Sequence, residues 1–184
     1  MDPATETQLV AGLRAGAADV HEAVFRAYYA RLCDFANSYL HNRSDAEEIV
    51  QDLFLALWQK HAQLEVRTSL RAYLFTAVRN RVLNRNAHAR LEQRYLEDLE
   101  RVDLEPVGTV PVDQRIEAIE IAERVQTAMA ELPLGCRRVL TLRWSDQLTY
   151  GEIAEVLGIS LKGVENQLAR ARKTLRQRLG DLIE

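Results

Sequence analysis

The stretch from Leu148 to Leu179 constrains the fold more than any other part of this sequence. Thr149 and Glu152 have the spacing of a capping box, which begins a helix. Gly158 suits the left-handed conformation that ends a helix, and Ser160 is a suitable N-cap for the next one. The stretch therefore predicts two helices joined by a tight turn, which is the arrangement of a helix-turn-helix.

The second of these helices has two chemically different faces. Apolar residues recur at the spacing of one buried face, at Val164, Leu168, Ala171 and Leu175. The opposite face is polar and basic, as a DNA-reading helix requires. Helix corners with a glycine also occur in proteins that never bind DNA, and a basic face is often only solvated, so this stretch favours DNA binding without excluding the plainer interpretation.

The spacing of apolar residues places the whole chain in the all-α class. The 184 residues are 47% hydrophobic, which is enough to build one or two cores. Helical spacing of apolar residues recurs along most of the chain, and no alternating strand pattern stands out. We expect two helical domains.

Charge is distributed unevenly, although the net charge is only −3. Residues 67–90 hold six arginines and no acidic residue, whereas residues 91–136 hold eleven acidic residues and four basic ones. Residues 137–184 are basic again, with nine basic and six acidic residues. Two basic blocks separated by an acidic connector indicate contact with phosphates at two places.

Several classes of protein are disfavoured by what the sequence does not contain. Cys33 and Cys136 lie far apart and lack partners at metal-ligand spacing, so we expect free buried thiols and no metal or cofactor. The longest apolar run, Leu53–Trp58, is too short to span a bilayer, and the first residues do not resemble a signal peptide. We expect a cytoplasmic protein without membrane insertion.

The segment at 45–60 is predicted to be a helix with two distinct stripes, and Ser44 is its expected N-cap. Asp19 is the expected N-cap of the preceding helix. One stripe is a core face of Ile49, Val50, Leu53, Phe54 and Leu57. The second stripe combines carboxylates with large apolar side chains, at Glu48, Gln51, Asp52, Leu55 and Trp58. Such a mixture suits a contact with a basic protein partner, although Trp58 packing under the following loop is the alternative.

The segment at 69–90 is predicted to be a basic helix capped by Thr68 or Ser69. Its inward face is Leu70, Leu74, Ala77, Val78 and Val82. A solvated face normally mixes both charge signs, but this one carries arginines and asparagines without any carboxylate. We expect Tyr73 and Phe75 to place rings among the arginines, a combination that binds single-stranded nucleic acid by stacking and by phosphate contact.

From Leu91 the helical pattern gives way to acidic residues followed by Pro106, Gly108 and Pro111, which indicates a linker. Helical spacing resumes at about Asp113 and continues to Leu132.

Arranged in this order, the chain resembles the extracytoplasmic-function (group IV) sigma factors of bacterial RNA polymerase. Three segments carry the resemblance: DAEEIVQDLFLALWQK at 45–60, SLRAYLFTAVRNRVLNR at 69–85, and ELPLGCRRVLTLRWSDQLTYGEIAEVLGISLKGVENQLARARKTLRQRL at 131–179. The resemblance implies a promoter-specificity subunit without enzymatic chemistry of its own. It also implies a region 2 domain at 6–92, an acidic flexible linker at 93–115 that threads the RNA-exit path, and a region 4 domain at 116–182.

The resemblance also implies roles for individual residues. The second stripe of helix 45–60 corresponds to the surface that docks on the clamp helices of the polymerase β′ subunit. The loop at 66–69 and helix 69–85 correspond to the reader of the −10 element, which captures an extruded base and helps melt the DNA. Its expected residues are Arg67, Thr68, Ser69, Tyr73, Arg79, Asn80, Asn84 and Arg85. Tyr73 stands where many members have Trp, and Asn84 where Asp is frequent.

The helix-turn-helix corresponds to the reader of the −35 element, with Ser160, Lys162, Glu165, Asn166, Arg170 and Lys173 as the expected contacts. By their chemistry, Asn166 suits adenine, Glu165 suits cytosine N4 and Lys162 suits guanine. The side chains of Arg170 and Lys173 are placed better for phosphate. The expected partners are core RNA polymerase, through the β′ clamp helices and the β flap, promoter DNA, and a separate anti-sigma protein.

Two other classes of function compete with this interpretation. A stand-alone helix-turn-helix regulator explains residues 131–179, but it leaves the acid-free helix at 69–85 and the stripe at 48–58 without a role. A nucleic-acid hydrolase lacks support, because the four histidines are scattered singly and no phosphate-binding glycine loop is present.

Overall fold

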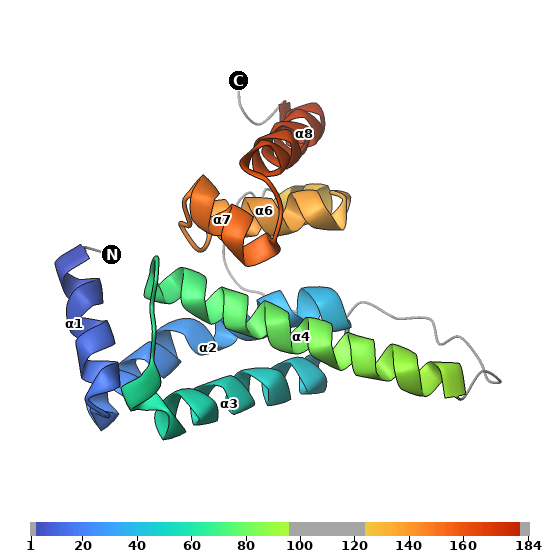
Figure 1. Ribbon diagram of the computed structural model, residues 1–184. Coiled ribbons are helices and arrows are strands. Elements are labelled where there is room, and N and C mark those ends of the chain that lie inside the picture. The colour runs from blue at the N-terminus through green and yellow to red at the C-terminus, as the bar shows by residue number, and fades with distance from the viewer. Residues whose placement is uncertain (1–2, 96–123, 181–184) are drawn as a thin grey trace, which may run out of the picture. The chain divides into compact units, whose positions relative to one another are not determined.

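The computed structural model describes residues 3–95 and 124–180, and these residues are helical with no strand among them (Figure 1). The all-α prediction is therefore confirmed. The chain divides into two compact units, one of Met1–Leu99 with Gly151–Gly158 and the other of Glu100–Tyr150 with Ile159–Glu184. Most of the predicted linker at 93–115 lies outside the described residues.

Among residues 3–95, the first unit contains four long helices and one short 3-10 turn. The long helices are α1 (Pro3–Arg14), α2 (Ala18–Leu40), α3 (Arg43–Gln59) and α4 (Leu70–Tyr95), and the turn is η1 (His61–Gln63). Helix α2 packs against α1, α3 and α4, while α1 also packs against η1 (Figure 1). The chain therefore returns to α1 just before it enters the loop that leads to α4.

The core of this unit comes from the faces that the periodicity predicted. The predicted core residues of α3 are buried, and so are Leu70, Leu74, Val78 and Val82 of α4. Phe75 is a correction, because its ring is fully buried and packs edge-on against Phe35 at 5.1 Å. Residues two positions apart on a helix point roughly 200° apart, so Phe75 and Tyr73 cannot share a surface.

In the first unit, two predicted helix caps are wrong and one is confirmed. Helix α3 is capped by Asn42, whose side chain accepts from the backbone N–H of Asp45, and not by Ser44. Helix α2 begins after Ala17 without a side-chain cap, so Asp19 lies within its first turn. Ser69 does cap α4, because its hydroxyl accepts from the backbone N–H of Ala72 at 3.1 Å.

The second unit is built on α6 (Leu134–Trp144) and α8 (Leu161–Leu179), which pack against each other. Residues 124–130 also form a helix, which is the described part of the helix expected from Asp113. The guanidinium of Arg137 donates to the backbone carbonyls of Met129, Ala130 and Leu132. Two of these carbonyls, those of Met129 and Ala130, lie in the last turn of the helix at 124–130, where carbonyl groups lack the usual partner four residues on.

The helix-turn-helix prediction is confirmed in its local chain geometry. Helix α7 (Tyr150–Leu157) is followed by Gly158 with a φ of 62°, and the hydroxyl of Ser160 then accepts from the backbone N–H of Gly163 at 3.1 Å. Cys33 and Cys136 are free and buried, as expected. Within residues 3–95 and 124–180, no helix combines the length and hydropathy that crossing a bilayer requires.

Candidate nucleic-acid and protein interfaces

Helix α3 carries an exposed surface on the side away from its core face. The five predicted residues of this docking stripe, Glu48, Gln51, Asp52, Leu55 and Trp58, are all exposed. Leu55 is 54% exposed and Trp58 is 42% exposed, which is high for side chains of this size and hydrophobicity. A solvated Leu and Trp beside three polar side chains form a surface suited to a protein partner.

Helix α2 supports this docking stripe with aromatic side chains that sequence reasoning missed. The ring of His21 meets that of Trp58 edge-on at 5.1 Å, so Trp58 rests against α2 while one part stays in solvent. The amide of Gln51 donates to the hydroxyl of Tyr29 at 3.3 Å. Tyr29 is in turn stacked on Phe25 at 4.6 Å. Periodicity within α3 alone could not have identified residues from a neighbouring helix.

The eight predicted contacts around α4 do not form one continuous exposed face. Arg67, Thr68, Asn80 and Asn84 are exposed, whereas Tyr73, Arg79 and Arg85 are half-buried. Ser69 is only 8% exposed, because it caps the helix. We call these eight residues the α4 surface. The structure brings Arg67, Thr68 and Ser69 to the start of α4 and spreads the other five along the helix.

A cavity of about 200 Å³ lies beside the start of α4, between the end of α3, η1 and α4 itself. Leu53, Leu57 and Leu64 contribute apolar lining, and Tyr73 is the one predicted contact that lines it. Three polar residues that the sequence analysis did not select also line it, namely Lys60, Gln63 and Arg81. Arg81 lies eight positions from Tyr73, on the same side of the helix, so helical spacing contained a signal for it.

Arg85 joins two sets of residues that the sequence analysis treated separately. Its guanidinium pairs with Glu48 at 2.7 Å and with Asp45 at 2.9 Å. The hydrogen bond from Arg85 to Glu48 raises the pKa of Arg85 above its ordinary value. One residue of the α4 surface is therefore paired with one residue of the docking stripe.

All six predicted contacts on the second basic helix lie on an exposed surface, which we call the α8 face: Ser160, Lys162, Glu165, Asn166, Arg170 and Lys173. The opposite side of α8 buries Val164, Leu168 and Ala171. Lys162 and Glu165 form an ion pair at 3.1 Å with both side chains largely in solvent. Such a pair costs little to separate, so both groups are available to a ligand.

Two residues beside the α8 face were not predicted. Arg172 lies over the ring of Trp144 with 5.9 Å to the ring centroid, and it also donates to the hydroxyl of Tyr150 at 3.2 Å. Trp144 is nevertheless 55% exposed at the end of α6. The contact ties α8 to the end of α6 and leaves an aromatic surface beside the basic helix.

These features define a helical protein with two regions suited to nucleic acid and one suited to a protein partner. The comparisons with known proteins agree with that class. The Sigma-70 region 2 family profile matches residues 24–92, and the Sigma-70, region 4 profile matches residues 122–175.

Similar proteins extend over almost the whole chain. The chain is 32% identical over 174 residues to the RNA polymerase sigma factor CnrH of Cupriavidus metallidurans, covering 89% of this chain and 90% of that protein. It is 24% identical over 179 residues to the ECF RNA polymerase sigma factor SigW of Bacillus subtilis, covering 92% and 94%. Its fold is similar to that of the sigma factor RpoE in complex with the anti-sigma factor NepR from Bartonella quintana, with a TM-score of 0.57 at 22% identity, covering 86% and 96%.

The chain therefore belongs to the sigma-70 family of RNA polymerase sigma factors, in its extracytoplasmic-function group. Its function is that of a transcription initiation factor. This membership decides against the stand-alone helix-turn-helix regulator.

Proposed function

We propose that the docking stripe of α3 binds the clamp helices of the polymerase β′ subunit. Leu55 and Trp58 supply exposed apolar area, and Glu48 and Asp52 supply negative charge for a basic partner. A few large side chains usually carry most of the binding energy of an interface, so Trp58 is the residue whose loss should cost most. The observation that carries this proposal is the exposure of Leu55 and Trp58 on a helix whose other face is fully packed.

The α4 surface is the reader of the −10 element and helps to hold the melted strand. The cavity of about 200 Å³ next to Tyr73 is large enough for one extruded base, with the Tyr73 ring at its wall. Lys60 and Arg81 provide positive charge at its rim for the adjoining phosphates, and Gln63 offers an amide for the edge of a base. This role belongs to a region 2 domain at 6–92.

The α8 face is the reader of the −35 element, within a region 4 domain at 116–182. Lys162, Glu165 and Asn166 lie in the first turns of α8, the part of a recognition helix that contacts base edges. Arg170 and Lys173 lie one to two turns further on and suit the phosphates. Binding, without catalytic chemistry by the chain itself, is sufficient for all of these roles.

Co-purification with bacterial core RNA polymerase tests the proposal most directly. Wild-type protein should bind the core enzyme, and a folded variant with Gln51→Ala, Asp52→Ala and Trp58→Ala should lose most of that binding. A matched control is Glu22→Ala, which removes an exposed carboxylate of α2 that forms a surface ion pair with Arg26. Equal binding by wild type and the triple variant removes the docking stripe from the proposal, and absence of wild-type binding removes the polymerase contact altogether.

A separate anti-sigma protein is the proposed regulator, and the cytoplasm is the proposed compartment. The RpoE structure with a similar fold is a complex with the anti-sigma factor NepR. Exposed apolar side chains on this chain, such as Leu55 and Trp144, are available to such a partner. When lysate from the native host is fractionated by sedimentation, part of the protein should then be found in a complex that is larger than the free protein and lacks polymerase. Absence of such a complex under all growth conditions counts against the regulator.

A further inference from the structure

Helix α1 makes polar contacts with both ends of the segment that leads into α4. Near the start of that segment, the Nε of Arg14 donates to the backbone carbonyl of Leu64 at 2.9 Å. The Nδ1 of His61 lies 2.9 Å from the backbone carbonyl oxygen of Arg14. When Nδ1 carries a proton, it donates a hydrogen bond to that oxygen. At the other end, a carboxylate oxygen of Glu6 accepts from the backbone N–H of Leu70 at 2.6 Å.

The contact between Glu6 and Leu70 acts on the first turn of α4. The first backbone N–H groups of a helix have no partner inside the helix, and they attract negative charge. Ser69 satisfies the N–H of Ala72, and Glu6 satisfies that of Leu70. Glu6 is thus a cap supplied from 64 positions earlier in the chain, and it fixes the position at which α4 starts relative to α1.

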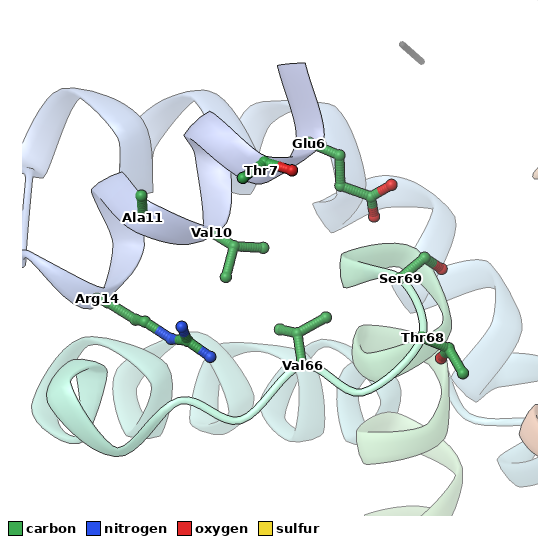
Figure 2. A pocket seen from close by; sticks show the side chains of 8 residues that line it. All are labelled: Glu6, Thr7, Val10, Ala11, Arg14, Val66, Thr68 and Ser69. Atoms are coloured by element: carbon green, nitrogen blue, oxygen red, sulfur yellow. The ribbon is translucent and has the colours of Figure 1, made fainter. Parts of the chain in front are cut away.

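Between these two attachments the segment does not pack closely on α1. A cavity of about 370 Å³ lies between α1 and the segment, and Val10 of α1 faces Val66 of the segment across it (Figure 2). Thr68 and Ser69 line the same cavity at the end near Glu6 (Figure 2). Helix α1 therefore holds residues 65–69 mainly through the contacts at the two ends of the segment.

We propose that α1 positions the −10-reading segment, with Glu6 and Arg14 as the positioning residues. The inference rests on the proposed function, because it concerns the segment that carries Arg67 and Thr68 into the α4 surface. The region 2 profile begins at residue 24, so α1 lies outside the part of the chain that it matches. Loss of either contact leaves the docking stripe and the α8 face intact but frees the segment to move, which lowers the affinity for melted −10 DNA.

The test uses holoenzyme assembled from the full chain and bacterial core RNA polymerase. Its probe is a single-stranded DNA oligonucleotide enriched from a random pool by the wild-type holoenzyme. Glu6→Ala and Arg14→Ala should each weaken binding of this probe about five- to tenfold, the size expected when one capping contact is lost. Glu6→Gln and Arg14→Lys retain an acceptor and a donor, respectively, and should recover part of the loss. Gln8→Ala, an exposed change on the same helix, should leave binding unchanged.

Two further readouts separate positioning from general destabilisation. Core-polymerase affinity should stay near the wild-type value in Glu6→Ala, and the melting temperature should fall by only a few degrees, as expected for one lost cap. Hydrogen exchange should speed up for the amides of residues 65–72 and not for those of α3. Wild-type affinity of both alanine variants for the probe overturns the inference, as does a parallel loss of core binding and of stability. If wild-type holoenzyme itself enriches no single-stranded sequence, the proposed −10 function fails first and independently.

Discussion

The two helices proposed to contact DNA, α4 and α8, expose their polar residues in very different ways. The α8 face lies on one helix and its N-cap, and its six residues are exposed. The α4 surface depends on its neighbours, since Arg85 is paired with α3, Tyr73 lines a cavity shared with α3 and η1, and the preceding segment is held by α1. Substitutions in neighbouring helices should therefore change −10 binding much more than −35 binding.

The largest expected effect separates two aromatic residues of α4. Phe75→Ala removes a fully buried ring and should lower the free energy of unfolding by about 3–5 kcal/mol. Tyr73→Ala should change stability much less but should weaken binding of single-stranded −10 DNA by about 1–3 kcal/mol, through lost stacking. Chemical denaturation and fluorescence anisotropy measure the two effects. A Phe75→Ala variant with wild-type stability contradicts the assignment of that ring to the core.

The next effect tests whether the α8 face has separate parts for bases and phosphates. Asn166→Ala should reduce discrimination at a single base pair by about 1–3 kcal/mol. Arg170→Ala should weaken binding to all duplex sequences alike and reduce the slope of the salt dependence by about one. Competition binding with a library of −35 duplexes at two salt concentrations distinguishes these outcomes. Identical profiles for the two variants contradict the division of roles.

The comparison of α4 with α8 also explains what could be predicted from the sequence. The exposed face of α8, its cap at Ser160 and the turn at Gly158 follow from spacing and side-chain chemistry within one short stretch. The error at Phe75 arose because an aromatic residue near arginines was assigned to their surface, although its spacing to Val78 and Val82 placed it on the core face. The cap at Ser44 was wrong because Asn42 and Ser44 are both good caps, and residue preference alone does not rank them.

Other parts of the site could not be predicted in this way, because they are formed by residues distant in sequence. The cavity beside Tyr73 needs the end of α3 and η1 to close it. The support of Trp58 by His21 and the capping of α4 by Glu6 both depend on how the helices pack. Periodicity identifies the face a residue occupies, but it does not identify the partner that face meets.

A smaller effect is expected at Gly163, which lies inside α8. A methyl group there would meet the Ser160 hydroxyl at 3.4 Å and Ile159 at 3.6 Å, both ordinary contact distances. Gly163→Ala should therefore stabilise the protein by about 1 kcal/mol through helix propensity. If the glycine serves close approach of the backbone to DNA, the same variant should bind −35 duplex more weakly. Thermal unfolding and duplex titration measure both effects, and unchanged binding discards the role in DNA approach.

The smallest effect concerns the pairing of Arg85 with α3, through which the docking stripe restrains the α4 surface. Arg85 and its partners are at least one-third exposed, so each pair contributes only about 0.2–1 kcal/mol. Asp45→Ala removes one of the two carboxylates that hold Arg85, and it should raise the affinity of the free protein for single-stranded DNA by up to about fivefold. Glu48→Ala should do the same, while also weakening core-polymerase binding as a member of the docking stripe.

The matched control for this prediction is Arg85→Ala, which should abolish the gain when it is combined with either acidic substitution. The gain should also shrink as salt is raised, because the interactions of exposed charges are screened. Fluorescence anisotropy of a labelled oligonucleotide at low and high salt measures both dependences. If the gain in DNA affinity caused by Asp45→Ala persists without Arg85, the gain comes from removing a carboxylate that repels the DNA. In that case α3 does not restrain α4 at this position, and α4 does not differ from α8 there.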